Sequence, residues 1–102
     1  MKTLRSYEPS EKDILKQIRG WLNWNRVFYW RNIGGLGHPV GLPDIQGILP
    51  GGRHFDIEVK KPGHKLTEHQ QRYMDKAQEL GALSFVAYSL EDVIDRLKNE
   101  IK

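Results

Sequence analysis

The spacing of hydrophobic positions changes along the chain, and the changes mark the expected elements. In three segments apolar residues recur three or four positions apart, which is typical of amphipathic helices. Each segment follows a Ser or Thr that has an Asp or Gln three residues later, a pattern typical of a helix N-cap. We therefore predict helices that begin after Ser10, Thr67 and Ser89, the second ending at Gly81 and the third reaching Ile101.

Four shorter segments carry aromatic and β-branched residues or alternate between apolar and polar side chains, as strands do. They cover residues 27–31, 44–49, 53–60 and 83–88, and a loop rich in glycine and proline covers 32–43. The predicted order is αβββαβα, an α/β arrangement. With 102 residues, the chain is expected to form one domain spanning 1–102.

The loop between the second and third strands sets which residues face each other. A two-residue turn at Gly51-Gly52 would set Asp44 opposite Val59 and mix apolar with charged residues on both faces. A three-residue loop, 50–52, sets Asp44 opposite Glu58 instead. The apolar side chains of both arms then share one face: Ile45, Leu49, Phe55, Ile57 and Val59. Burial favours this second register, with the charged residues on an exposed face.

Composition narrows the class of protein. Hydrophobic residues make up 38% of the chain and charged residues 28%, and no apolar run is long enough to cross a membrane. The N-terminus lacks the apolar stretch of a secretory signal, so we expect a cytoplasmic protein with no membrane partner. The absence of cysteine excludes disulfides, thiolate zinc sites and cysteine nucleophiles. The net charge of +3 is compatible with a polyanion partner without requiring one.

The polar face of the hairpin carries the candidate chemistry, because Asp44, Glu58 and Lys60 lie on it. Glu-x-Lys alone is weak: about one match is expected by chance from 13 acidic residues, and Glu100-Ile101-Lys102 is a second match, which we discard. The hairpin context strengthens the first match. Adjacent carboxylates repel each other unless a hard divalent cation binds them, and such a cation can activate a phosphodiester for hydrolysis. A solvated strand face with an ion pair is the simpler alternative.

Two motifs resemble a known superfamily. Gly41-Leu42-Pro43-Asp44 and Glu58-Val59-Lys60 resemble the signature of the PD-(D/E)xK nucleases, whose restriction-endonuclease-like fold has an αβββαβ core. Within it the chain is most similar to the VRR-NUC family, through Trp30-Arg31-Asn32, the motifs above and the segment 66–70. The similarity covers about residues 8–95. The similarity implies that this chain has the αβββαβ core with a mixed four-stranded sheet, followed by a C-terminal helix.

The resemblance also implies roles for individual residues. Mg²⁺ or Mn²⁺ would be held by Asp44, Glu58 and the main-chain carbonyl of Val59. The catalytic residues would comprise Asp44, Glu58, the catalytic lysine Lys60, the upstream acid Glu11 and the supporting Gln70. Glu11 and Gln70 also have structural explanations, because acids are favoured in the first turn of a helix and Gln70 completes a capping pattern.

These features predict a divalent-metal-dependent, structure-specific DNA endonuclease. One alternative is a non-catalytic nucleic-acid-binding module with the same fold, and another is a protein-interaction domain with an incidental acidic pocket. Small stand-alone members of the family, often viral, are similar to Holliday junction resolvases. We therefore predict a homodimer that acts on branched, four-way DNA, and a phage or prophage origin is left open.

Three further groups of residues have expected positions. The aromatic residues of the first helix and strand are expected in the core or at a subunit interface rather than as base-stacking platforms: Trp21, Trp24, Phe28 and Trp30. Contacts with phosphates are expected for about half of the nearby cations, Arg31, Lys61, Lys65, Arg72 and Lys76. The histidines show no metal-ligand spacing and are expected at the surface or near DNA: His38, His54, His64 and His69.

Overall fold

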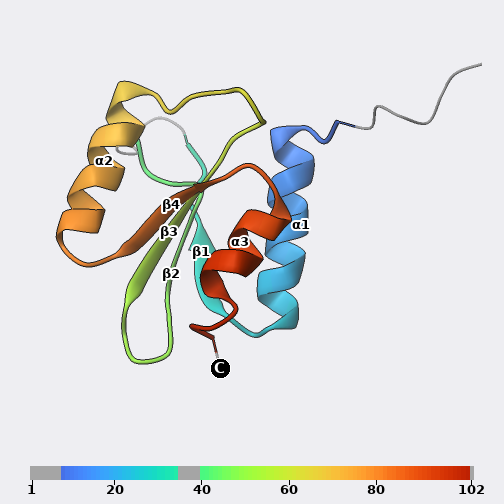
Figure 1. Ribbon diagram of the computed structural model, residues 1–102, viewed down its shortest axis with the longest axis vertical. Helices are drawn as coiled ribbons and strands as arrows, with labels where there is room; N and C mark the ends of the chain where they lie inside the picture. Colours follow the sequence, from blue (N-terminus) through green and yellow to red (C-terminus); the bar gives the residue numbers. More distant parts are fainter. Residues whose placement is uncertain (1–7, 35–39, 102) are drawn as a thin grey trace, which may run out of the picture.

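The computed structural model describes residues 8–34 and 40–101, and it has helices on both faces of one sheet (Figure 1). The elements are α1 Glu11–Trp24, β1 Phe28–Arg31, β2 Ile45–Ile48, β3 His54–Val59, α2 Glu68–Glu79, β4 Leu83–Ala87 and α3 Leu90–Leu97. The predicted order αβββαβα is confirmed. The last helix is shorter than predicted, because a turn in which Glu100 N–H donates to the Leu97 carbonyl follows it. Ile101 lies beyond that turn and is packed against the core, partly buried.

The helix starts lie where the capping patterns predict them. The Ser10 hydroxyl accepts a hydrogen bond from Asp13 N–H at 3.0 Å, and the Thr67 hydroxyl accepts one from Gln70 N–H at 3.1 Å. Gly81 has a φ of 99° directly after the C-cap of α2, a conformation that favours glycine. These local signals fix both ends of α2, the helix that carries Gln70.

The sheet has the strand order β1-β2-β3-β4, with two antiparallel pairs followed by one parallel pair. In the central hairpin Ile45 pairs with Ile57 and Gln46 with Asp56. This is the register of the three-residue loop, closed by Leu49 N–H donating to the Arg53 carbonyl at 2.8 Å. The predicted register is therefore confirmed, and its continuation sets Asp44 opposite Glu58.

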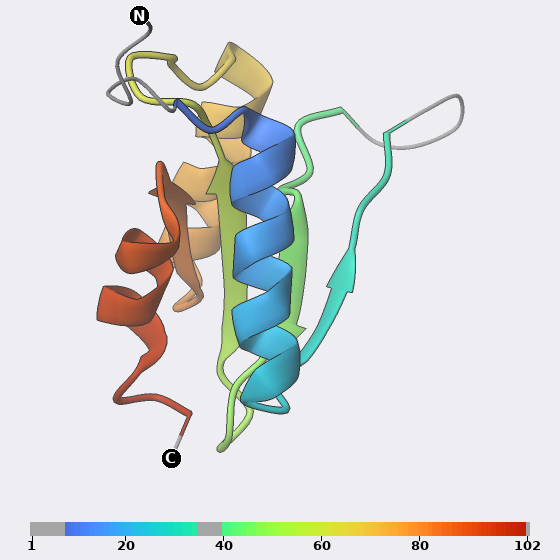
Figure 2. The same ribbon diagram turned by 90° about the vertical axis from the view of Figure 1, so that its right-hand side faces the viewer.

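The two faces of the sheet differ in chemistry. Helices α1 and α3 cover one face, and α2 lies on the other (Figures 1 and 2). The first face carries the apolar core, in which Ile14, Ile18 and Leu22 of α1 pack with Ile45, Phe55, Ile57, Phe85, Val93 and Leu97. The buried polar residues occupy the face toward α2: Gln46, Asp56, Glu58 and Ser84.

The expectation that the charged face of the hairpin is exposed is wrong. Asp56 is 0% exposed and Glu58 is 4% exposed. Strict alternation along β3 correctly separates apolar from polar side chains, but α2 covers the polar side as well. The carboxylates therefore lie in a partly dehydrated layer between the sheet and a helix, where their interactions are stronger than at the surface.

Of the four aromatic residues expected in the core or at a subunit interface, one has the core position, and for the other three the interface stays a prediction. Trp24 is 86% exposed, Phe28 is 64% exposed and Trp30 is 38% exposed, whereas Trp21 packs against the core. β1 is an edge strand of the sheet, and it carries Phe28 and Trp30. Over 8–34 and 40–101, no helix has the length and apolar character needed to cross a bilayer.

Candidate active site

Two carboxylates meet at one end of the central hairpin. Asp44 directly precedes β2, and Glu58 is the fifth residue of β3. The Asp44 carboxylate accepts a hydrogen bond from Val59 N–H, with 2.8 Å between Oδ2 and the nitrogen. This bond crosses the hairpin and holds the Asp44 side chain beside the strand that carries Glu58. The main-chain carbonyl of Asp44 is also fixed, because it accepts from Asn32 N–H at 2.9 Å.

Glu58 is the buried member of the pair. Its Oε2 accepts a hydrogen bond from the Gln70 side-chain amide at 3.1 Å, while its buried Oε1 has no hydrogen-bond partner within the described part of the chain. Burial, together with the charge of the neighbouring Asp44, raises the pKa of Glu58 to about 8. Lys60 opposes this rise. A buried carboxyl with an unused oxygen next to a second carboxylate is therefore the main electrostatic feature of the site.

Gln70 both caps α2 and contacts Glu58, so it fits the structural and the site interpretation of its motif. Its Oε1 accepts a hydrogen bond from Thr67 N–H at 2.9 Å, which completes the capping box of α2. Its Nε2 donates to Glu58 across the gap between helix and sheet. The cap orients the amide, so the same contacts that begin the helix also aim a donor at the buried carboxylate.

Glu11 and Lys60 lie at the same end of the sheet. Glu11 begins α1, and its Oε2 is 3.5 Å from Lys61 N and 3.9 Å from His64 Nδ1. Its charge contributes to the raised pKa of Glu58. Lys60 follows β3 directly and, by alternation, shares the face of Glu58. The structure thus brings the five predicted catalytic residues together, from the starts of two helices and from the central hairpin.

The side chains at this site supply only part of the ligand set that a hard divalent cation needs. Among residues 8–34 and 40–101, no group of three or more His, Cys, Asp or Glu side chains could hold a metal ion. The two carboxylates would need additional oxygen donors, such as the Val59 carbonyl and water. Mg²⁺ suits this arrangement because it usually retains several waters and binds through one or two carboxylates. The unpartnered Glu58 Oε1 and the repulsion from Asp44 are the features that such an ion would relieve.

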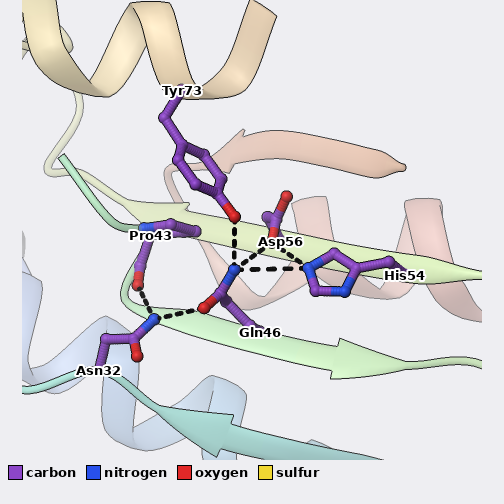
Figure 3. Close-up of polar contacts among 6 residues, drawn as sticks. All are labelled: Asn32, Pro43, Gln46, His54, Asp56 and Tyr73. Atoms are coloured by element: carbon purple, nitrogen blue, oxygen red, sulfur yellow. Dashed lines mark hydrogen bonds and ion pairs between the residues drawn. The ribbon is translucent and has the colours of Figure 1, made fainter. Parts of the chain in front are cut away.

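A polar cluster next to the site was not predicted. It joins Asn32, Gln46, His54, Asp56 and Tyr73 between the sheet and α2 (Figure 3). Period-two spacing from Asp44 and Glu58 could have indicated Gln46 and Asp56. Tyr73 comes from a distant segment, so no local pattern indicates it. His54 is half-buried and takes part in this cluster, and His38 lies outside the described residues.

Two solved structures have the same fold as this chain. One, a "VRR_NUC domain protein", is 18% identical with a TM-score of 0.72, and the match covers 92% of this chain and 89% of that one. A second, a "VRR_NUC domain", is 25% identical with a TM-score of 0.71, and it covers 88% and 97%. No protein-family model matches the chain, and no curated protein matches it.

The similarity to these structures supports a nuclease-type α/β domain. More narrowly, the predicted resemblance to the VRR-NUC family is confirmed in three dimensions over most of the chain, together with the mixed four-stranded sheet.

Proposed function

We propose that this protein is a divalent-metal-dependent DNA endonuclease that hydrolyses phosphodiester bonds. The observation that carries the proposal is the buried Glu58 carboxyl, which lies beside Asp44 with one oxygen unpartnered among the described residues. In a purely structural protein, an apolar or amide side chain at this position would make the fold more stable, because burying an unpaired acid is unfavourable. A bound cation would convert the pair from a repulsive arrangement into a useful one.

Each residue has a role in this proposal. Asp44 and Glu58, with the Val59 carbonyl, would hold Mg²⁺ or Mn²⁺, which supplies neutralisation of phosphate charge and a lower pKa for a coordinated water. Val59 N–H and the Gln70 amide orient the two carboxylates. Lys60 would stabilise negative charge on the phosphate in the transition state. Glu11 would adjust the field around Glu58 from the start of α1.

A cleavage assay tests the proposal. Linear duplex, flap and four-way DNA would be incubated with the protein in Mg²⁺ or Mn²⁺, with EDTA as the negative condition. Asp44→Asn, Glu58→Gln and Lys60→Ala should each lower the rate at least ten-fold, and Gln70→Ala should lower it about ten-fold, because outer contacts of metal ligands typically contribute that much. Glu100→Ala, from the second Glu-x-Lys match, is the matched control and should cut normally. Glu58→Gln activity above a tenth of wild type would contradict the assignment.

Metal titration separates the nuclease from a non-catalytic binding module. Calorimetry should detect Mn²⁺ binding to the wild type and its loss in Asp44→Asn and Glu58→Gln, with circular dichroism confirming that both variants are folded. DNA binding measured by fluorescence anisotropy should persist in these variants. A wild type that binds DNA but neither binds Mn²⁺ nor cuts any substrate would favour the binding module.

We also propose that the protein acts as a homodimer on four-way DNA junctions. The open edge at β1 and the exposed Trp24 and Phe28 support this assembly, since exposed aromatic patches and strand edges commonly mark interfaces. Two sites related by a two-fold axis could cut a pair of strands in one junction.

Light scattering tests the assembly. The wild type should have about twice the monomer mass of 11.9 kDa. Phe28→Glu should return it to the monomer mass, whereas Leu80→Glu, at an exposed apolar position that is the C-cap of α2, should not. A monomeric wild type that cuts linear duplex and junction equally well would overturn this part of the proposal.

A further inference from the structure

The polar cluster between the sheet and α2 is centred on Gln46 (Figure 3). The Gln46 amide nitrogen donates to Asp56 Oδ1 at 2.9 Å and to the Tyr73 hydroxyl at 2.7 Å. Its Oε1 accepts from the Asn32 side-chain amide at 2.9 Å. Both N–H bonds and the carbonyl oxygen of Gln46 are therefore used, each by a different segment of the chain.

The neighbours of Gln46 give its side chain a single orientation. Asn32 contributes a donor, so the Gln46 oxygen must face it, and the nitrogen must face the Asp56 carboxylate. His54 adds a second donor to Asp56, with 2.8 Å between Nε2 and Oδ1. An exchange of the two amide ends of Gln46 would set donor against donor and acceptor against acceptor.

Each of three elements carries one residue of the proposed active site and, two or three positions away in sequence, one residue of the cluster. Gln46 is two residues after Asp44 on the β2 arm, and Asp56 is two residues before Glu58 on β3. An offset of two along a strand keeps side chains on one face. Tyr73 is three residues after Gln70, which on a helix puts the two on the same side of α2. Three elements that carry site residues are thus tied together one step away from the site.

Asn32 extends the cluster to the loop that carries Asp44. Its side-chain amide donates to the Pro43 carbonyl at 2.8 Å as well as to Gln46, and its main-chain N–H donates to the Asp44 carbonyl. The main-chain carbonyls before and after the Asp44 Cα are therefore both held by one residue. Through Asn32, the orientation of Gln46 and the position of Asp44 are linked.

We propose that Gln46 and Tyr73 are positioning residues for the active site, which set the spacing between α2 and the β2–β3 hairpin so that Gln70 stays in contact with Glu58. The inference rests on the proposed nuclease function, but it concerns contacts that exist without substrate. Neither residue would touch DNA or metal. Each acts through Gln70 or Asp44.

A double-mutant cycle tests the proposal. Tyr73→Phe removes only the hydroxyl and should lower kcat about ten-fold with little change in KM for DNA. In a Gln70→Ala background the same change should lower kcat less than two-fold, because the contact that Tyr73 secures is already gone. Tyr29→Phe is the matched control: it also loses one hydrogen bond, to Asn23, but on the opposite face of the sheet, and it should leave kcat unchanged. Effects of Tyr73→Phe that multiply fully with Gln70→Ala would overturn the proposal.

A spectroscopic measurement keeps the inference separate from the function. In ¹H–¹⁵N spectra, the Gln70 side-chain amide is identified by its disappearance in Gln70→Ala. Its signals should shift in Tyr73→Phe and remain in place in Tyr29→Phe, and Mn²⁺ affinity should fall about three- to ten-fold only in Tyr73→Phe. An unchanged Gln70 amide in Tyr73→Phe refutes the positioning role even if the wild type cuts DNA. If the amide shifts in Tyr73→Phe but the wild type cuts no DNA, the positioning role is supported and the nuclease function is refuted.

Discussion

Replacement of Glu58 by glutamine should remove the pH dependence that this buried acid imposes on stability. Burial, with help from Asp44, raises the pKa of Glu58 from its ordinary value of 4.5 to about 8 in the folded, metal-free protein. The folded state therefore holds a proton that the unfolded state has released at every pH between these two values. Stability from this group is fully present below pH 4.5 and is lost as the pH rises through about 8.

The size of the effect follows from the two pKa values. Between them, the free energy of unfolding should fall by about 1.4 kcal/mol per pH unit through Glu58 alone, or about 5 kcal/mol in total. Glu58→Gln cannot ionise and keeps nearly the same shape. The difference in unfolding free energy between Glu58→Gln and wild type should therefore rise with pH up to about pH 8 and then become constant.

Urea unfolding in EDTA, followed by tryptophan fluorescence at several pH values from 5 to 9, measures this difference. Glu100→Gln, at an exposed acid, should track the wild type across the range. Asp44→Asn removes one cause of the raised pKa but leaves the larger cause, burial, so it should shift the upper end of the slope to lower pH without abolishing it. A difference between Glu58→Gln and wild type that is flat from pH 5 to 8 would refute the account of a protonated, buried Glu58.

Two predictions concern the backbone. Gly47→Ala should lower the free energy of unfolding by about 3 kcal/mol, since an added Cβ would lie 2.4 Å from the Phe55 ring. Gly20→Ala on α1 meets nothing within 4 Å and should raise the free energy of unfolding by about 0.5–1 kcal/mol. Equal effects of the two substitutions in urea unfolding would contradict this. Arg26 has a φ of 56° after α1, so Arg26→Gly should raise the unfolding free energy by about 0.5–1 kcal/mol, and a fall in thermal unfolding temperature would show that its side chain contributes more than the strain.

The elements and the central register could be predicted because their signals are local. Capping residues at Ser10 and Thr67 determine where helices start, and the loop 50–52 with its flanking alternation determines which strand positions face each other. The position of Asp44 beside Glu58 follows from those two facts. For the aromatic residues the sequence left core and subunit interface open, because hydrophobicity and strand propensity do not reveal that β1 lies at the edge of the sheet. Which strand is left uncovered depends on the packing of the whole chain.

The polar layer under α2 was missed for a related reason. Alternation along β3 is the pattern of a strand with one wet face, and it does not show that a helix returns to cover that face. The return is specified by contacts such as Gln46 with Tyr73, which are 27 residues apart in sequence. Matched polar groups, one on each element, contribute to making such a covering favourable.

The division of chemistry between the two faces of the sheet explains how a chain of 102 residues can bury charged groups and still fold. The face under α1 and α3 contains the continuous apolar core, which provides most of the hydrophobic stabilisation. On the other face Met74 is the buried apolar residue that α2 contributes, and side-chain hydrogen bonds from Tyr73, Gln70 and Gln78 join that helix to the sheet. Each such bond contributes only about 1 kcal/mol net, but each is directional. The α2 face therefore adds little to stability, but it fixes the orientation of its side chains. A site that depends on a buried carboxyl requires this, because the carboxyl must point in one direction.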